Sequence, residues 1–165
     1  MHKINNNDTR AGFTIVELLI VIVVIGILAA ITIVSFNGVT ARSTFAKEKS
    51  EMALINKAIA MYYSENSNYP STGGSGSWSG FGQAPSFVPG IAPAYISKIP
   101  QMPTSSSANN SYLYTSNGTD YKLIRYSDST SGLPSVQLTH SLTDPARSGQ
   151  LGGAWGYWSS GATAW

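Results

Sequence analysis

Histidine, cysteine, serine and acidic side chains are the groups from which catalysis would be expected. In this sequence they are few or lack the spacing of a catalytic site. It contains 8 Asp and Glu residues, 2 histidines and no cysteine among 165 residues. His2 lies in a polar N-terminal stretch, so His140 has no second histidine with which to form a metal site or a proton relay. The serines occur in polar stretches without the strand-to-helix Gly-x-Ser-x-Gly turn of a nucleophile. The sequence therefore predicts a protein that is not an enzyme.

One carboxylate stands out because of its surroundings. Glu17 is followed by residues 18–31, all of which are apolar or glycine. An acid at the centre of a membrane helix costs about 2.5–3.5 kcal/mol, and such residues are usually functional and have a partner. Glu17 is therefore a candidate functional residue. The alternative is a signal anchor that tolerates Glu17 near its end, where the side chain reaches the membrane interface.

The element that would position Glu17 is a membrane-spanning helix. As a helix, residues 13–34 would be roughly 33 Å long, enough for a hydrocarbon core of about 30 Å. No proline occurs between Phe13 and Tyr69, so nothing breaks the helix at the end of the apolar run. We predict one helix from Phe13 to about Glu65.

The second half of this helix is predicted to be amphipathic. Beyond Ala41, apolar side chains recur at steps of three and four residues, at Met52, Ile55, Ile59 and Tyr62 or Tyr63. This spacing gives one apolar stripe that would lie against a folded head. Polar side chains are assigned to the other face: Lys47, Glu48, Lys49, Glu51, Asn56 and Lys57.

The rest of the chain predicts a small antiparallel sheet. Residues 112–115 and 121–126 are rich in tyrosine and aliphatic side chains, and the loop between them contains Asn-Gly, which favours a β-hairpin. We expect a third strand around residues 136–139. Residues 151–165 concentrate aromatic side chains among glycines and are predicted to pack as a flap, with at least one of Trp155 and Trp158 buried.

Composition limits the function further. Charged residues make up 11% of the chain and the formal net charge is +2, which is too little for a surface that neutralises many phosphates of a nucleic acid. The absence of cysteine excludes disulfides and cysteine-based metal sites.

The N-terminal residues together form a recognisable pattern. A polar leader containing Lys3 and Arg10 is followed by Gly12, Phe13 and, four residues after that phenylalanine, Glu17. With the long apolar run behind it, this arrangement resembles the signal of type IV prepilins and type II secretion pseudopilins.

The resemblance implies a specific processing step. A prepilin peptidase would remove the leader, residues 1–12, by cutting between Gly12 and Phe13, and Phe13 would then be N-methylated. The protonated amine of Phe13 on a neighbouring subunit would pair with Glu17 inside a dry bundle of helices, because a buried unpaired carboxylate is costly.

The resemblance also implies a pilin-like α+β fold, with a long N-terminal helix packed on a small antiparallel sheet. Residues 13–40 would be the transmembrane and filament-core helix, and residues 41–165 the head. The implied partners are other copies of the chain in a helical homopolymer, the prepilin peptidase, the pilus assembly platform with its ATPase machinery, and the cytoplasmic membrane. The implied location is that of a single-pass cytoplasmic membrane protein before assembly and of an extracellular or cell-surface filament afterwards.

Our interpretation is therefore a structural subunit of a type IV pilus-like extracellular filament. An alternative is a major pseudopilin of a type II secretion system or a DNA-uptake pseudopilus. Residues 95–103 are similar to the stretch that leads to a Pro-x-x-Pro element in major pseudopilins, although Met102 stands where Asp is frequent there. The lack of cysteine also departs from the C-terminal disulfide of many Gram-negative pilins. A further alternative is a monomeric membrane-anchored binding module.

Calcium is the one cofactor that the sequence raises. Major pseudopilins use a calcium site in the head, and Asp120, Asp128 and Asp144 could supply carboxylate ligands together with backbone carbonyls. Their spacing matches no EF-hand. The alternative is that each aspartate serves a turn, because Asp beside Gly, Ser and Pro is common in loops.

Overall fold

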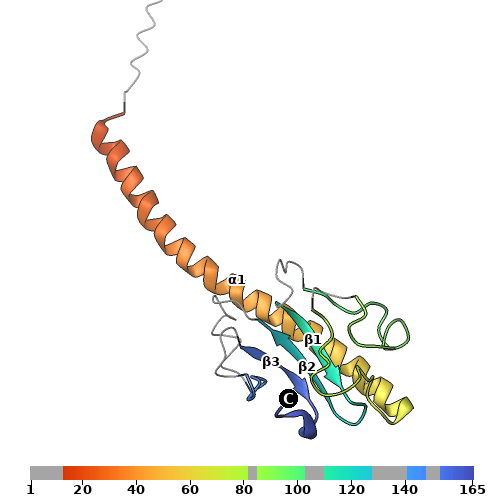
Figure 1. The fold of residues 1–165 in the computed structure, drawn as a ribbon. Coiled ribbons are helices and arrows are strands. Elements are labelled where there is room, and N and C mark those ends of the chain that lie inside the picture. The colour runs from red at the N-terminus through yellow and green to blue at the C-terminus, as the bar shows by residue number, and fades with distance from the viewer. Residues whose placement is uncertain (1–12, 82–84, 103–109, 128–140, 148–152) are drawn as a thin grey trace, which may run out of the picture. The chain divides into compact units, whose positions relative to one another are not determined.

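The computed structural model of this chain consists of one long helix and a three-stranded sheet (Figure 1). It describes residues 13–81, 85–102, 110–127, 141–147 and 153–165. Two compact units can be distinguished, Met1–Thr40 and Ala41–Trp165, and we call the second unit the head.

The helix α1 runs over Ile15–Asn66, 52 residues in all. Its start and end lie within two residues of those predicted, which confirms a single helix through the polar stretch after the apolar run. The helix is long and apolar enough to cross a membrane, and none of its most apolar window is buried inside the chain. So large an exposed apolar surface requires a membrane or other helices around it.

The predicted hairpin is confirmed. Strands β1 (Ser111–Ser116) and β2 (Tyr121–Tyr126) pair antiparallel, with Tyr114 opposite Leu123. In the turn between them, Gly118 has a φ of 90°, a backbone conformation that glycine adopts without a steric penalty. The glycine of the Asn-Gly sequence therefore lies in the turn of the hairpin, as predicted.

The third strand of the sheet differs from the prediction. Strand β3 is Ala154–Trp158 and pairs antiparallel with β2, which gives the order β1-β2-β3. It lies in the segment that was expected to be a flap, whereas residues 136–139 lie outside the described residues. Gly156 is needed because a Cβ at this position would collide with the carbonyl oxygen of Leu123 in β2. The strand shows no alternation of apolar and polar residues, and this pattern is the signal by which strands are usually found.

The main core of the head lies between the second half of α1 and one face of the sheet (Figure 1). The predicted helix stripe is confirmed, since Met52, Ile55 and Ile59 are fully buried. The sheet contributes buried side chains from all three strands, namely Tyr112, Tyr114, Leu123 and Trp155. Trp155 also packs edge-to-face on Phe45 of α1, with ring centroids 5.4 Å apart. The prediction that a C-terminal tryptophan completes the core is therefore confirmed at Trp155, which has no exposed surface.

One residue assigned to the solvent face of the helix is buried instead. Glu48 is 3% exposed, and its Oε1 lies 3.4 Å from Nε of Arg125 in β2. The assignment was wrong because β2 presents an arginine to the helix, and a buried guanidinium needs an anionic partner. Burial lowers the pKa of Arg125, and the Glu48 carboxylate opposes that shift.

Two more polar residues of the helix also contact the sheet. The hydroxyl of Tyr112 donates a hydrogen bond to Oε2 of Glu51 at 2.7 Å, and that of Tyr121 donates to Oδ1 of Asn56 at 2.6 Å. Burial, with the hydrogen bond to Glu51, raises the pKa of Tyr112, and burial raises the pKa of Tyr121 to about 12. These bonds satisfy the polar ends of tyrosines whose rings lie in the core.

An ionic cluster covers part of the other face of the sheet. The ammonium of Lys122, which is fully buried, donates to Oδ1 of Asp144 at 2.8 Å and to the main-chain oxygens of Thr163 and Trp165 at 3.0 and 2.9 Å. Arg147 donates to Oδ2 of Asp144 and to the Trp165 oxygen. Burial lowers the pKa of Lys122, while the hydrogen bond to Asp144 opposes that shift. The cluster thus joins β2, residues 141–147 and the segment after β3.

Trp155→Ala should strongly destabilise the head, because truncating a buried tryptophan costs about 3–5 kcal/mol. In a fragment of residues 41–165 we expect the melting temperature to fall by roughly 10–20 °C, as measured by calorimetry. The matched control is Trp158→Ala, since Trp158 is only partly buried. Equal, small shifts for the two variants would mean that Trp155 does not close the core.

Asp144→Asn should cost about 3–5 kcal/mol, because it leaves the buried ammonium of Lys122 without its counter-charge. Urea denaturation of the same fragment measures this loss. The double variant Lys122→Met with Asp144→Leu should recover part of it, since no unpaired charge is then buried at Lys122. The single variants Lys122→Met and Asp144→Leu complete the cycle, and a double variant that loses as much stability as these two losses added together would contradict the pairing.

Candidate functional site

The candidate site is the first turn of α1, where Thr14 and Glu17 bond to each other reciprocally. Thr14 precedes the first helical residue, and Glu17 is the third residue of the helix. The backbone N–H of Thr14 and its hydroxyl donate to Oε2 of Glu17 at 2.9 and 2.8 Å, and the N–H of Glu17 donates to the Thr14 hydroxyl at 3.2 Å. This pattern is a capping box, in which two N–H groups at the helix start gain side-chain acceptors.

The cap revises the environment expected for Glu17. The carboxylate lies in the first helical turn, where the exposed N–H groups and the helix dipole favour negative charge. Its cost in an apolar medium is therefore lower than the cost of an acid at the midpoint of a span. Glu17 remains the only charged side chain between residues 13 and 41, so its charge is not neutralised by any side chain of this segment.

Phe13 lies directly beside the capping box. Its side chain is 86% exposed, and its nitrogen is part of a peptide bond as long as the leader is attached. Cleavage before Phe13 would turn this nitrogen into a cationic amine near the start of the helix. Gly12, the predicted residue before the cut, lies outside the described residues together with the rest of the leader.

The apolar surface behind Glu17 offers one kind of contact only. The large apolar residues from Leu18 to Ile31 are exposed to about half their area or more, for example Leu18 at 61% and Ile31 at 60%. The surface has no polar group other than the hydroxyl of Thr32, which donates back to the carbonyl oxygens of Leu28 and Ala29. Such a surface packs against lipid or against like helices by van der Waals contact.

The aspartates predicted for calcium have other partners where the structure describes them. Both oxygens of Asp144 accept hydrogen bonds from cationic groups, Lys122 and Arg147, which leaves no free negative charge for a metal ion. Asp120 accepts a hydrogen bond from the hydroxyl of Ser159 at 2.6 Å. Within the described residues no group of three or more acidic or histidine side chains could hold a metal ion. Asp128 lies outside them, so calcium binding stays a prediction that the described residues do not favour.

Sequence reasoning missed Thr14 and the ionic cluster for different reasons. The capping box was visible in the sequence, because Thr14 and Glu17 have the Ser/Thr-x-x-Glu spacing before an apolar run. The pairing of Lys122 with Asp144 had no such signal, since the two residues are 22 positions apart in the chain. Only the fold brings them together.

Comparison with known proteins gives one family match near the N-terminus and several relatives that align with about two fifths of the chain. Residues 7–33 match the family described as the prokaryotic N-terminal methylation motif. The chain is similar to type II secretion system core protein G of Escherichia coli strain K12, 34% identical over 65 residues, which are 39% of this chain and 45% of that protein. It is also similar to the type IV major pilin protein PilA of Myxococcus xanthus strain DK1622, 40% identical over 63 residues, 38% of this chain and 29% of that protein.

A third relative is core protein G of Vibrio cholerae, 32% identical over 63 residues, 38% of this chain and 43% of that protein. The chain thus spans less than half the length of the curated relatives it matches. No solved structure matches it significantly. The methylation motif, the long apolar helix with its small antiparallel sheet and these relatives together support the resemblance of the chain to type IV pilins and type II secretion pseudopilins.

Proposed function

We propose that this chain is a structural subunit of a type IV pilus-like extracellular filament. Before assembly its apolar helix anchors it in the cytoplasmic membrane, and after assembly the same helix lies in the filament core. The head covers the outside. The protein performs no catalysis in this role, and its partners are further copies of itself, a prepilin peptidase and the assembly platform with its ATPase.

The observation that carries the proposal is the apolar surface of α1 with one carboxylate in its first turn. A surface of this length is stable only in lipid or against similar helices. If the helix only had to lie in lipid, a helix without Glu17 would insert at a lower free-energy cost. A bundle of identical helices gives the carboxylate a use, because each helix start would bring an amine as well as an acid.

Cleavage supplies that amine. When the bond before Phe13 is hydrolysed, its nitrogen gains a positive charge that can pair with a carboxylate of a neighbouring subunit. In a dry bundle the pair neutralises both groups, whereas either group alone would be costly to bury. The capping box keeps the Glu17 side chain at the start of the helix until that partner arrives.

Two alternatives remain open. A secretion or DNA-uptake pseudopilus would use the same helix, and the similarity to core protein G favours it as much as the similarity to PilA favours a pilus. A monomeric membrane-anchored binding module would need neither cleavage before Phe13 nor assembly. Electron microscopy of material sheared from cells distinguishes the filament from the anchor.

The first prediction from the proposed function concerns the mature N-terminus. In assembled material the chain should begin at Phe13 with one added methyl group on its nitrogen, and mass spectrometry of the N-terminal peptide measures both. Replacing Gly12 by a bulky residue should leave an unprocessed protein in the membrane. Peptides that retain residues 1–12 in assembled filaments would contradict the proposal.

The second prediction separates the charge of Glu17 from its role as a cap. Glu17→Ala removes both, whereas Glu17→Gln removes the charge and keeps a side chain that serves a capping box. Both variants should insert into the membrane at least as well as the natural chain, because an acid is removed from an apolar segment.

Both variants should also yield few or no filaments, as counted by electron microscopy of sheared material. Thr14→Val is the complementary control, since it removes the cap hydroxyl and keeps the charge. If Glu17→Gln assembled normally while Thr14→Val did not, the cap and not the charge pair would be the requirement.

A further inference from the structure

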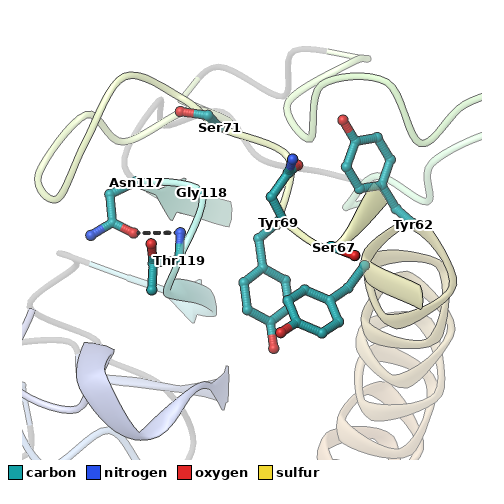
Figure 2. A pocket seen from close by; sticks show the side chains of 9 residues that line it. Tyr62, Ser67, Tyr69, Ser71, Asn117, Gly118 and Thr119 are labelled. Atoms are coloured by element: carbon teal, nitrogen blue, oxygen red, sulfur yellow. Dashed lines mark hydrogen bonds between the residues drawn. The ribbon is translucent and has the colours of Figure 1, made fainter. Parts of the chain in front are cut away.

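The head contains a hollow where the end of α1 meets the turn between β1 and β2 (Figure 2). Its volume is about 480 Å³, within the range of about 300–1,000 Å³ that is usual for ligand pockets. Its walls come from the last turn of the helix, the residues that follow it and the turn at residues 117–119. All of them belong to the head, so the hollow does not depend on the membrane-spanning unit.

Tyrosine rings form the aromatic part of the hollow. Tyr63 and Tyr69 stack with ring centroids 4.4 Å apart and an interplanar angle of 28°. Tyr69 packs in turn on Tyr121, again with centroids 4.4 Å apart, which holds the pair against the sheet. Tyr63 is nevertheless 43% exposed. Part of Tyr63 is therefore accessible to a ligand.

Neutral hydrogen-bonding groups complete the walls. The side-chain oxygen of Asn117 accepts from the N–H groups of Thr119 and Asp120 at 2.9 and 2.8 Å, which fixes the amide and leaves its NH₂ group as a donor. The Thr119 hydroxyl has no hydrogen bond to any described residue, and Ser67 and Asn68 add a further hydroxyl and amide. In Figure 2, Tyr69 lies between the turn that carries Asn117 and Thr119 and the end of the helix.

The charge of the hollow limits the ligand class. None of the described residues that line it is acidic or basic. The side chains that form ion pairs with charged ligands, arginine or lysine for an anion and carboxylates for a cation, are thus missing from these walls. A purely apolar ligand would cover the NH₂ group of Asn117 and the hydroxyl of Thr119 without giving them a partner, which is unfavourable. A neutral molecule that combines apolar surface with many hydroxyl groups fits the walls best.

The hollow is also built rigidly. Ser67, which follows the helix, has a φ of 58°, a left-handed conformation that is unfavourable for a non-glycine residue. The N–H of Tyr69 donates to the carbonyl oxygen of Gly118 at 2.7 Å and so ties one wall to the other. A ligand would therefore meet preformed walls and would lose little affinity to ordering them.

We propose that this hollow binds a sugar ring of an uncharged oligosaccharide. The C–H face of such a ring packs on an aromatic side chain, here the exposed surface of Tyr63 backed by Tyr69. Its hydroxyls exchange hydrogen bonds with amides and hydroxyls, here those of Asn117, Thr119 and Asn68. The site does not depend on filament assembly. A failure of sugar binding would therefore leave the proposed function untouched, and the reverse also holds.

The test uses the full-length chain in lauryldimethylamine oxide, because a detergent with a sugar headgroup would compete for the site. Maltohexaose and chitohexaose serve as neutral probes, and the two together report whether acetamido groups matter. An oligogalacturonate of the same length is the charged control. Isothermal titration calorimetry measures affinity, and saturation-transfer NMR shows which sugar protons lie against the protein.

At least one neutral probe should bind, and the oligogalacturonate should bind more weakly. Tyr63→Ala should weaken binding about 3- to 10-fold, whereas Tyr63→Phe, which keeps the ring, should bind nearly as well as the natural chain. Thr119→Val keeps the shape of an exposed side chain and should weaken binding about 2- to 10-fold. Phe81→Ala is the matched control, because Phe81 is an aromatic residue of similar exposure, 45%, outside the hollow.

Two results would overturn the proposal. One is the absence of binding by both neutral probes at millimolar concentration while the head keeps its circular dichroism spectrum and melting temperature. The other is binding that Phe81→Ala weakens as much as Tyr63→Ala does, because that would be non-specific adsorption to exposed aromatic rings.

Discussion

The uncovered apolar surface of α1 is the constraint on which the rest of this molecule depends. No part of the described chain covers it, so the helix needs lipid or other helices around it. In the function that we propose, the single carboxylate at its start suits both environments, because the capping box with Thr14 supplies hydrogen bonds before assembly and a cationic amine would supply charge afterwards. Glu17 would then have a use at each stage, and neither stage would need a further charged side chain in the apolar segment.

The head is held together without disulfides. Its sheet is covered on both faces: the helix stripe packs on one, and on the other a buried lysine ties the residues after β3 to the centre of the sheet. Paired buried charges of this kind contribute less to stability than an apolar core does, but breaking one partner is costly. The ionic cluster therefore fixes where the C-terminal segment lies, and Trp155 on the opposite face supplies the apolar contact.

Sequence patterns predicted those parts of the fold that local periodicity determines. The long helix, the stripe of Met52, Ile55 and Ile59, and the hairpin with its Asn-Gly turn were all found in this way. Strand β3 was not, because its two covered faces remove the usual alternation. Glu48 was misassigned because its partner Arg125 is distant in sequence. The candidate site at Glu17 was recognised by its contrast with the apolar run, whereas the hollow beside Tyr63 exists only once helix end and turn are brought together.

The most direct test of this account is a cryo-electron microscopy structure of filaments sheared from cells, at a resolution that separates side chains. We expect each helix to begin at Phe13, with its amine nitrogen about 2.7–2.9 Å from the Glu17 carboxylate of a neighbouring subunit. Apolar side chains of residues 18–31 should be buried between helices. A filament in which Glu17 contacts only Thr14 of its own chain, with no amine within hydrogen-bonding distance, would contradict the account.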